Sequence, residues 1–271
     1  MSRNFELLSQ VGRMHELVQS QLEPLPMQAE GMPAAMEPPP MMDASAVAVA
    51  ETPVEEQIHD TPSFEMSGTV RDEISKLVQN LFLGQQGSRR VVFSGIEPGC
   101  GATFTCAHAA DWLAQTRGTV CVVDCNLRSP GLHEQFGKEN HHGLSDALMG
   151  AGPIREFVHR ISRNLWLLSC GSSAEAAQNL MSSERMRSRM SELRGTFDYV
   201  LIDAAPLNAS NDAIVLGGQS DGVVLMLKAN SSRREAARKA VQELQAANVR
   251  TLGAVLNQRT FPIPEKIYRA L

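Results

Sequence analysis

Residues 91–105 read VVFSGIEPGCGATFT and combine a short apolar run, a glycine-rich turn and the small residues that open a helix. The apolar run at residues 91–93 predicts a buried parallel strand, and residues 102–113 predict the helix that follows it. A glycine-rich loop between such a strand and such a helix points its backbone N–H groups, and the positive end of the helix dipole, at one spot. That spot suits a phosphate group.

The loop carries part of a Walker A motif. Gly99 and Gly101 allow the backbone to approach a ligand closely, and Thr103 stands where a Walker A hydroxyl would hold Mg²⁺. The lysine of the motif is missing, because the positions that read Gly-Lys-Ser/Thr in a Walker A loop read Gly101, Ala102 and Thr103 here. On its own, such a turn is equally consistent with a structural turn in another α/β domain.

Two acidic strand ends favour the nucleotide interpretation. Residues 120–124 (VCVVD) and 199–203 (YVLID) predict two further buried strands, each of which ends in an aspartate. Acids at the carboxyl ends of strands beside a phosphate loop lie where a Mg²⁺ ion and an attacking nucleophile need negative charge. We therefore expect Asp124 and Asp203 to meet the glycine loop in one crevice.

The rest of the chain alternates helical and strand patterns. This alternation predicts an α/β fold with a mostly parallel, doubly wound sheet and helices on both faces. Further helices are expected at residues 70–83, 144–149, 154–161, 173–193, 211–216 and 233–247, and further strands at residues 165–168, 222–227 and 249–256.

The first quarter of the chain differs in composition from the remainder. Residues 1–70 contain eleven acidic and two basic side chains, whereas residues 71–271 contain 19 acidic and 23 basic ones. The sequence predicts four parts: an amphipathic helix over 1–23, a disordered Pro-rich linker over 24–67, a P-loop NTPase-like domain over 68–260 and a C-terminal tail over 261–271.

The amphipathic segment has two interpretations. Apolar residues from Phe5 to Leu22 recur at three- and four-residue spacings and form one stripe on a helix. Such a helix either packs on its own domain or docks onto a partner, and the long linker behind it favours docking. Acids flank the stripe and only two arginines accompany it, which disfavours a helix bound to the membrane surface.

Composition also narrows the partners and the compartment. No apolar run reaches the roughly 18 residues that span a bilayer, and the N-terminus lacks the apolar core of a signal peptide, so we expect a cytoplasmic protein. The net charge of −5 disfavours a DNA partner. The basic helix around residues 233–239 is better explained as a solvated face.

At these residues the chain resembles the bacterial tyrosine kinases (BY-kinases, of the CpsD/CapB type) of capsule and exopolysaccharide synthesis, within the MinD/ParA superfamily of P-loop ATPases. SGIEPGCGATF is similar to their phosphate loop, VCVVDCNLRSP to their second acidic motif and FDYVLIDAAP to their Walker B stretch. The segments LSCGSSAEAAQNLMSSERM and VRDEISKLVQNLF also resemble family segments. The likeness covers roughly residues 68–260.

The chain departs from the family at positions that have chemical roles in it. Ala102 replaces the P-loop lysine, and Asn126 replaces the second acid of the Asp-x-Asp pair. The opening helix keeps Glu73 of a motif that joins subunits in a ring, but Lys76 and Gln79 replace its arginines. The C-terminal tyrosine cluster is reduced to Tyr268.

The resemblance implies ATP or ADP with Mg²⁺ as cofactors and assigns roles by position. It places catalysis at Asp124, Asn126, Arg128 and Asp203, and metal binding at Thr103, Asp124 and Asp203. The implied nucleotide-binding residues are Gly95, Pro98, Gly99, Cys100, Gly101, Ala102, Thr103 and Phe104, and the candidate phosphoacceptor is Tyr268.

Three functions follow from the resemblance. The first is a degenerate, weak or inactive kinase that acts as a regulatory partner in exopolysaccharide assembly. It would sit at the inner face of the plasma membrane through a membrane chain-length (polysaccharide co-polymerase) adaptor, and homo-oligomers are compatible with it. The second is a working autokinase or ATPase in which Arg128, Arg89 or a neighbouring subunit's base replaces the lysine. The third is a ParA/MinD-type positioning ATPase, although those proteins carry a further lysine where Glu97 stands.

Overall fold

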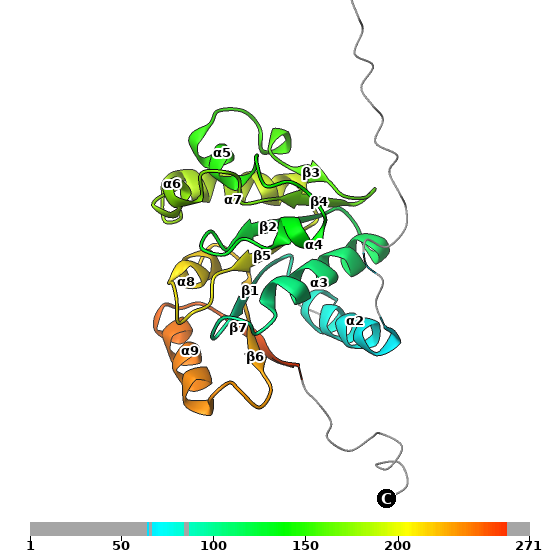
Figure 1. Ribbon diagram of the computed structural model, residues 1–271, viewed down its shortest axis with the longest axis vertical. Coiled ribbons are helices and arrows are strands. Elements are labelled where there is room, and N and C mark those ends of the chain that lie inside the picture. Colours follow the sequence, from blue (N-terminus) through cyan, green and yellow to red (C-terminus); the bar gives the residue numbers. More distant parts are fainter. Residues whose placement is uncertain (1–63, 65–66, 84–86, 259–271) are drawn as a thin grey trace, which may run out of the picture. The chain divides into compact units, whose positions relative to one another are not determined.

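The computed structural model describes residue 64 and residues 67–83 and 87–258. The predictions for residues 1–23 and 261–271, and for the linker 24–67 apart from Phe64 and Ser67, lie outside these residues. Within them one seven-stranded sheet has the order β3-β4-β2-β5-β1-β6-β7 (Figure 1). Its strands are β1 (Arg90–Gly95), β2 (Val120–Cys125), β3 (His159–Arg160), β4 (Leu165–Leu168), β5 (Tyr199–Ala204), β6 (Gly222–Lys228) and β7 (Thr251–Asn257).

The sheet is parallel except at one edge. Every neighbouring pair runs parallel apart from β3 and β4, which are antiparallel. In the register of β2 against β5, Asp124 lies directly opposite Asp203. The predicted mostly parallel α/β sheet is therefore confirmed, and its carboxyl edge carries both acids.

Helices cover both faces of this sheet (Figure 1). Helix α3 packs on β1, β2 and β5, and α2 packs on α3, whereas α8 packs against β1 and β6 and α9 against β7. The helices are α2 (Gly68–Phe82), α3 (Ala102–Thr116), α4 (Leu132–Gln135), α5 (Leu144–Met149), η1 (Ile154–Glu156), α6 (Ala174–Gln178), α7 (Glu184–Thr196), α8 (Asp212–Gly217) and α9 (Arg234–Ala246).

The central strands are apolar because both of their faces are covered. All six residues of β2 are buried, as are five of the six in β1 and in β5. Continuous apolar runs of this kind are typical of parallel strands between two helical layers. The sheet therefore gives its loops a rigid base.

Two helix predictions were wrong in detail. Residues 154–161 were expected to form a helix, but only the 3₁₀ turn η1 forms, and His159 and Arg160 instead pair with Leu167 and Trp166 along the outer edge of β4. The helix expected over 173–193 is divided into α6 and α7. Helix α7 begins where the Ser183 side chain accepts a hydrogen bond from the Met186 N–H, at 3.2 Å.

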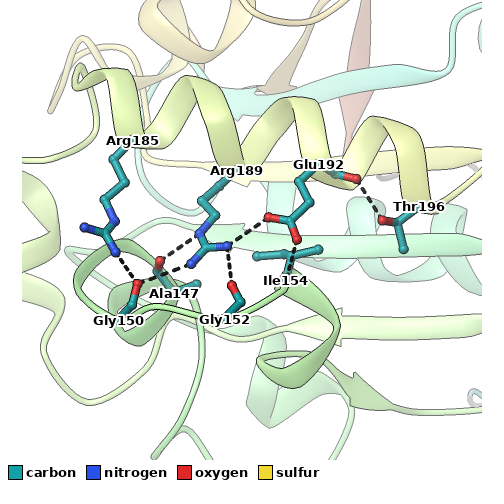
Figure 2. A network of polar contacts seen from close by, with 8 residues as sticks. All are labelled: Ala147, Gly150, Gly152, Ile154, Arg185, Arg189, Glu192 and Thr196. Atoms are coloured by element: carbon teal, nitrogen blue, oxygen red, sulfur yellow. Dashed lines mark hydrogen bonds and ion pairs between the residues drawn. The ribbon is translucent and has the colours of Figure 1, made fainter.

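A buried arginine on α7 holds the segment between α5 and η1 (Figure 2). Arg189 is 8% exposed, and its guanidinium donates hydrogen bonds to the carbonyl oxygens of Ala147 (2.8 Å), Gly150 (3.3 Å) and Gly152 (2.8 Å). It also donates to the Glu192 carboxylate, at 2.8 Å. With four hydrogen-bond partners, one of them a carboxylate, the buried charge of this guanidinium is compensated.

The network continues from Glu192 to the backbone of η1. The second Glu192 oxygen accepts a hydrogen bond from the Ile154 N–H at 2.6 Å, and Arg185 donates to the carbonyl of Gly150 (Figure 2). The N–H groups of Leu144 and Ser145 donate to the carbonyl oxygens of Ser169 and Cys170, the two residues that follow β4. The Arg189 network thus fixes the segment that lies beside the carboxyl end of β4.

Candidate nucleotide site

The loop from β1 to α3 has the shape predicted from its glycines. Gly99 has φ +79° and Gly101 has φ +84°, a left-handed conformation that other residues adopt at a cost in free energy. A Cβ atom at Gly101 would also collide with the side-chain amide of Asn257. Both glycines are required by backbone geometry, and α3 begins directly after the second one.

Six successive backbone N–H groups in this loop, from Gly99 to Phe104, have no hydrogen-bond acceptor among the described residues. The first intrahelical bond of α3 runs from the N–H of Thr105 to the carbonyl of Gly101. Gly99 and Phe104 are exposed and Cys100 is buried. Free N–H groups at the N-terminus of a long helix form a site suited to anions, phosphate above all.

The two predicted acids meet this loop. The Thr103 hydroxyl donates a hydrogen bond to Asp203 Oδ2 at 2.6 Å, and Asp124 lies opposite Asp203 in the sheet. Burial raises the pKa of the Asp203 carboxyl well above its usual range, and the charge of Asp124 raises it further, although the Thr103 hydrogen bond opposes both effects. Thr103, Asp124 and Asp203 therefore lie together.

Asp124 organises the loop that follows β2. One carboxylate oxygen accepts from the N–H of Asn126 at 3.1 Å, and the other accepts from Gly131 and Leu132, each at 3.0 Å. Burial raises the pKa of Asp124, and these three hydrogen bonds act against that rise. Gly131 approaches Thr103 so closely that a Cβ there would lie 3.3 Å from its methyl group. The loop after β2 thus packs against the phosphate loop.

Several side-chain atoms near these acids are buried without a partner in the described residues. They are Asp203 Oδ1, Asn126 Oδ1, Asp212 Oδ2 and His133 Nδ1. Buried polar atoms without partners are uncommon and are typical of sites that complete themselves with a ligand. Sequence reasoning missed His133 and Asp212. Asp212 begins the helix that follows the strand containing Asp203. Because ligand sites in parallel sheets lie beyond the carboxyl ends of the strands, this position could have indicated Asp212.

The oxygen-rich set fits Mg²⁺. Magnesium prefers oxygen ligands and is usually bound through one or two carboxylates together with substrate phosphates. Asp203, Asp124 and Thr103 would supply the protein oxygens, and the metal would neutralise charge on the phosphates. No group of three or more His, Cys, Asp or Glu residues within the described ranges is placed to hold a metal alone.

The expected cation is absent at its position. Ala102 is half-buried, and no described lysine or arginine forms an ion pair with Asp124 or Asp203. Arg128 is exposed and makes no hydrogen bond or ion pair with another described residue. The predicted phosphoacceptor Tyr268 lies outside the described residues.

Contacts that the sequence did not predict support the loop from two sides. Glu97 accepts a hydrogen bond from the Ser232 hydroxyl at 2.8 Å, which ties the loop to the segment after β6. The side-chain amides of Asn257 and Gln258 donate to the carbonyls of Cys100 and Gly99, each at 3.1 Å. Asn257 is the last residue of β7. Its position at the carboxyl end of a strand was the sequence feature that could have indicated a role beside the phosphate loop.

Comparisons with known proteins agree with this architecture. A family profile described as "Cellulose biosynthesis protein BcsQ" matches residues 89–246. The tyrosine-protein kinase YwqD of Bacillus subtilis is 31% identical over 170 residues, which are 62% of this chain and 72% of YwqD.

Two further matches extend the comparison. EpsB of Ralstonia nicotianae is 31% identical over 202 residues, covering 74% of this chain but only 26% of EpsB, so the chain spans about a quarter of that relative. The solved kinase domain of VpsO aligns with a TM-score of 0.66 and 26% identity, over 71% of this chain and 95% of that domain. Within the part that the structure describes, no helix has the length and apolar character needed to cross a membrane.

Proposed function

The chain belongs to the BY-kinase-like family of MinD/ParA P-loop proteins, and we propose that it is a nucleotide-binding regulatory member with weak or no phosphoryl transfer. The observation that carries this proposal is a phosphate loop with six unpaired N–H groups beside two buried aspartates, in which Ala102 replaces the family lysine. Binding and transfer depend on these groups to different degrees.

Nucleotide binding survives the loss of the lysine. A charge-assisted contact to phosphate contributes on the order of 1.5–3 kcal/mol, so its loss weakens binding by roughly tenfold to a hundredfold. The amide cradle and the helix dipole remain, and Thr103, Asp124 and Asp203 would still supply oxygen ligands to a Mg²⁺ ion. We therefore expect ATP or ADP to bind with reduced affinity.

Phosphoryl transfer depends more strongly on the missing groups. A cation that stabilises the transferring phosphoryl group contributes about 10³ to 10⁵ in rate. Asn126 also removes the second acid, and its Oδ1 is an uncharged, weaker base than a carboxylate. A chain that lacks both groups binds the nucleotide without using it efficiently.

The cellular role rests on the family match. The profile that matches residues 89–246 is described as a cellulose biosynthesis protein, which supports a role in the assembly of an exopolysaccharide. We propose a cytoplasmic protein that reaches the membrane through a chain-length adaptor, with residues 1–23 as the docking segment. A homo-oligomer is compatible with this role, and DNA is not a proposed partner.

Calorimetry tests the binding half of the proposal. ATP and ADP are titrated into the native chain with and without Mg²⁺, and into an Ala102→Lys variant. We expect measurable, Mg²⁺-dependent binding by the native chain and an affinity about tenfold higher in the variant. Ala236→Lys adds the same charge on the exposed face of α9 and should leave the affinity unchanged. Absence of binding in both the native chain and Ala102→Lys would contradict the proposal.

Labelled ATP tests the transfer half. The native chain with ATP and Mg²⁺ should incorporate little phosphate, and Tyr268→Phe should not change that amount. Rapid autophosphorylation that disappears in Tyr268→Phe would exclude the inactive reading.

One observation favours a second candidate, a working autokinase in which Arg128 replaces the lysine. Arg128 is exposed and has no described partner, and its loop packs on Thr103 through Gly131. In that case Arg128→Ala would abolish transfer and Arg128→Lys would retain part of it. Equal rates in the native chain and in Arg128→Ala would remove this candidate.

A further inference from the structure

A polar cavity lies at the opposite edge of the sheet from the phosphate loop. It has a volume of about 590 Å³ and is lined by residues at the amino ends of β1, β5, β6 and β7 and at the end of α7. β1 is six residues long, so its two ends lie about 20 Å apart. The cavity is therefore separate from the nucleotide site.

Four arginines and two aspartates line this cavity. Arg89 and Arg90 stand at the start of β1, Arg250 precedes β7, and Arg194 lies in the last turn of α7. The acids are Asp198 and Asp221. The ionised side chains of the lining thus carry a positive excess.

The two carboxylates are already engaged by the fold. Asp221 accepts from the N–H groups of Arg89 and Arg90 at 2.7 and 2.9 Å, and it pairs with the Arg90 guanidinium at 2.5 Å. Asp198 accepts from the N–H and the hydroxyl of Thr119 at 2.9 and 2.8 Å. The hydrogen bonds hold strand ends together, and they engage both oxygens of Asp221 and the Oδ2 oxygen of Asp198.

Three guanidinium groups remain without a hydrogen bond, although, besides the Thr119 hydrogen bonds, the nearby charge of Arg89 lowers the pKa of the Asp198 carboxyl. Arg89, Arg194 and Arg250 are exposed, and their side chains form no hydrogen bond or ion pair with a described residue. They come from three different elements and surround one cavity. Guanidinium groups carry a planar set of donors that matches phosphate oxygens in pairs.

The apolar part of the cavity lining is small. Phe197 and Val200 line it and are only 8% and 1% exposed. A volume of this size is within the range of roughly 300–1,000 Å³ that small-molecule sites occupy. The combination suits a compact organic molecule with concentrated negative charge.

We propose that this arginine cavity binds a small phosphorylated compound with at least two negative charges, at a site independent of the phosphate loop. Arg89, Arg194 and Arg250 hold the phosphate oxygens, and Phe197 contacts the organic part. Since the cavity joins β1 and β5 to the end of α7, its ligand would link the sheet to the helix that carries the Arg189 network.

Nuclear magnetic resonance on the full chain tests the proposal, because it reports the two sites separately. Inorganic pyrophosphate is titrated first, and uridine diphosphate next. We expect the amide signals of Gly87 and Arg250 to shift with both probes, and an Arg194→Ala, Arg250→Ala double variant to bind about tenfold more weakly at this site. Signals of Gly99 and Gly101 report the phosphate loop, so failure there does not affect this test.

Matched variants and a second anion sharpen the result. Arg155→Ala removes an exposed arginine outside the cavity and should leave the affinity unchanged. Arg194→Lys, Arg250→Lys keeps the charge without the paired donors and should bind with intermediate affinity. The proposal is overturned if the cavity signals do not shift, if Arg155→Ala weakens binding as much as the double variant, or if citrate binds as tightly as pyrophosphate.

Discussion

The phosphate loop and the Arg189 network are both built from polar groups, but they treat those groups differently. In the network a buried guanidinium has four hydrogen-bond partners, and Glu192 uses both carboxylate oxygens. In the loop six N–H groups have no described acceptor, and Asp203 Oδ1 is buried without one. Paired groups hold a fold together, whereas unpaired groups indicate a ligand.

The network should give the largest loss of stability. Arg189→Ala leaves the carbonyl groups of Ala147 and Gly152 and one Glu192 carboxylate oxygen without their donor, and we expect the free energy of unfolding to fall by about 3 kcal/mol in urea titrations. Arg185→Ala, which removes one exposed arginine from the same helix, should cost less than about 1 kcal/mol. Equal losses in the two variants would show that the buried pairing is not what stabilises this segment.

The second largest loss of stability is expected from a substitution that strains the backbone of the phosphate loop. Gly101→Ala forces a Cβ into a left-handed conformation against Asn257, so we expect a loss of about 1–2 kcal/mol in unfolding free energy and impaired ADP binding. The control is Gly195→Ala on α7, where nothing lies within 4 Å of the new methyl group. That variant should gain up to about 1 kcal/mol.

A substitution of the buried aspartate beside the phosphate loop is expected to increase stability. Asp203→Asn replaces a buried carboxylate by a neutral amide of similar shape, and it should raise the free energy of unfolding by about 1 kcal/mol at neutral pH. The same variant should lose Mg²⁺-dependent nucleotide binding. Asp72→Asn on the exposed face of α2 should change neither quantity. A destabilised Asp203→Asn would show that the carboxylate is structural.

The smallest effect concerns pH. His108 is 4% exposed and stacks between Phe64 and Phe104, with ring centroids 4.2 and 3.9 Å away, and burial lowers its pKa despite a hydrogen bond with the Phe104 carbonyl. The unfolded chain then binds the proton more readily. Stability present above pH 6.5 should therefore decline as the pH falls below that value.

His108→Phe removes this titration. Melting temperatures measured between pH 5 and 8 should fall less steeply on acidification in the variant than in the native chain, by an amount that corresponds to less than about 1 kcal/mol. Parallel profiles for the two proteins would contradict the assignment to His108.

Much of the central architecture follows from local sequence. Continuous apolar strands, the positive-φ glycines and the acids at strand ends are short-range features, so they predicted β1, β2, β5 and the meeting of Thr103 with Asp203. The supports of the loop are contacts between distant segments. Ser232 binds Glu97 across 135 positions and Asn257 binds Cys100 across 157, so no local pattern identifies which residues pair, even where a strand end such as Asn257 can be recognised.

The error over 154–161 has the same origin. Its apolar residues fit a helical spacing, but the free edge of β4 offered backbone partners that the local pattern does not reveal. Tertiary pairing overrode local preference there. The arginine cavity was equally hidden, because its three unpaired arginines are far apart in the chain.

The two edge strands of the sheet differ in how well they are protected against pairing with another strand. On one side β3 is a two-residue antiparallel strand, too short to template another chain. On the other side β7 runs for seven residues, has no described strand beyond it and exposes 58% of Leu256. Among the strands that the structure describes, β7 is therefore the edge strand long enough to pair with an added strand. Slow hydrogen exchange in the β7 amides that face β6, and fast exchange in those that face outward, would be its signature.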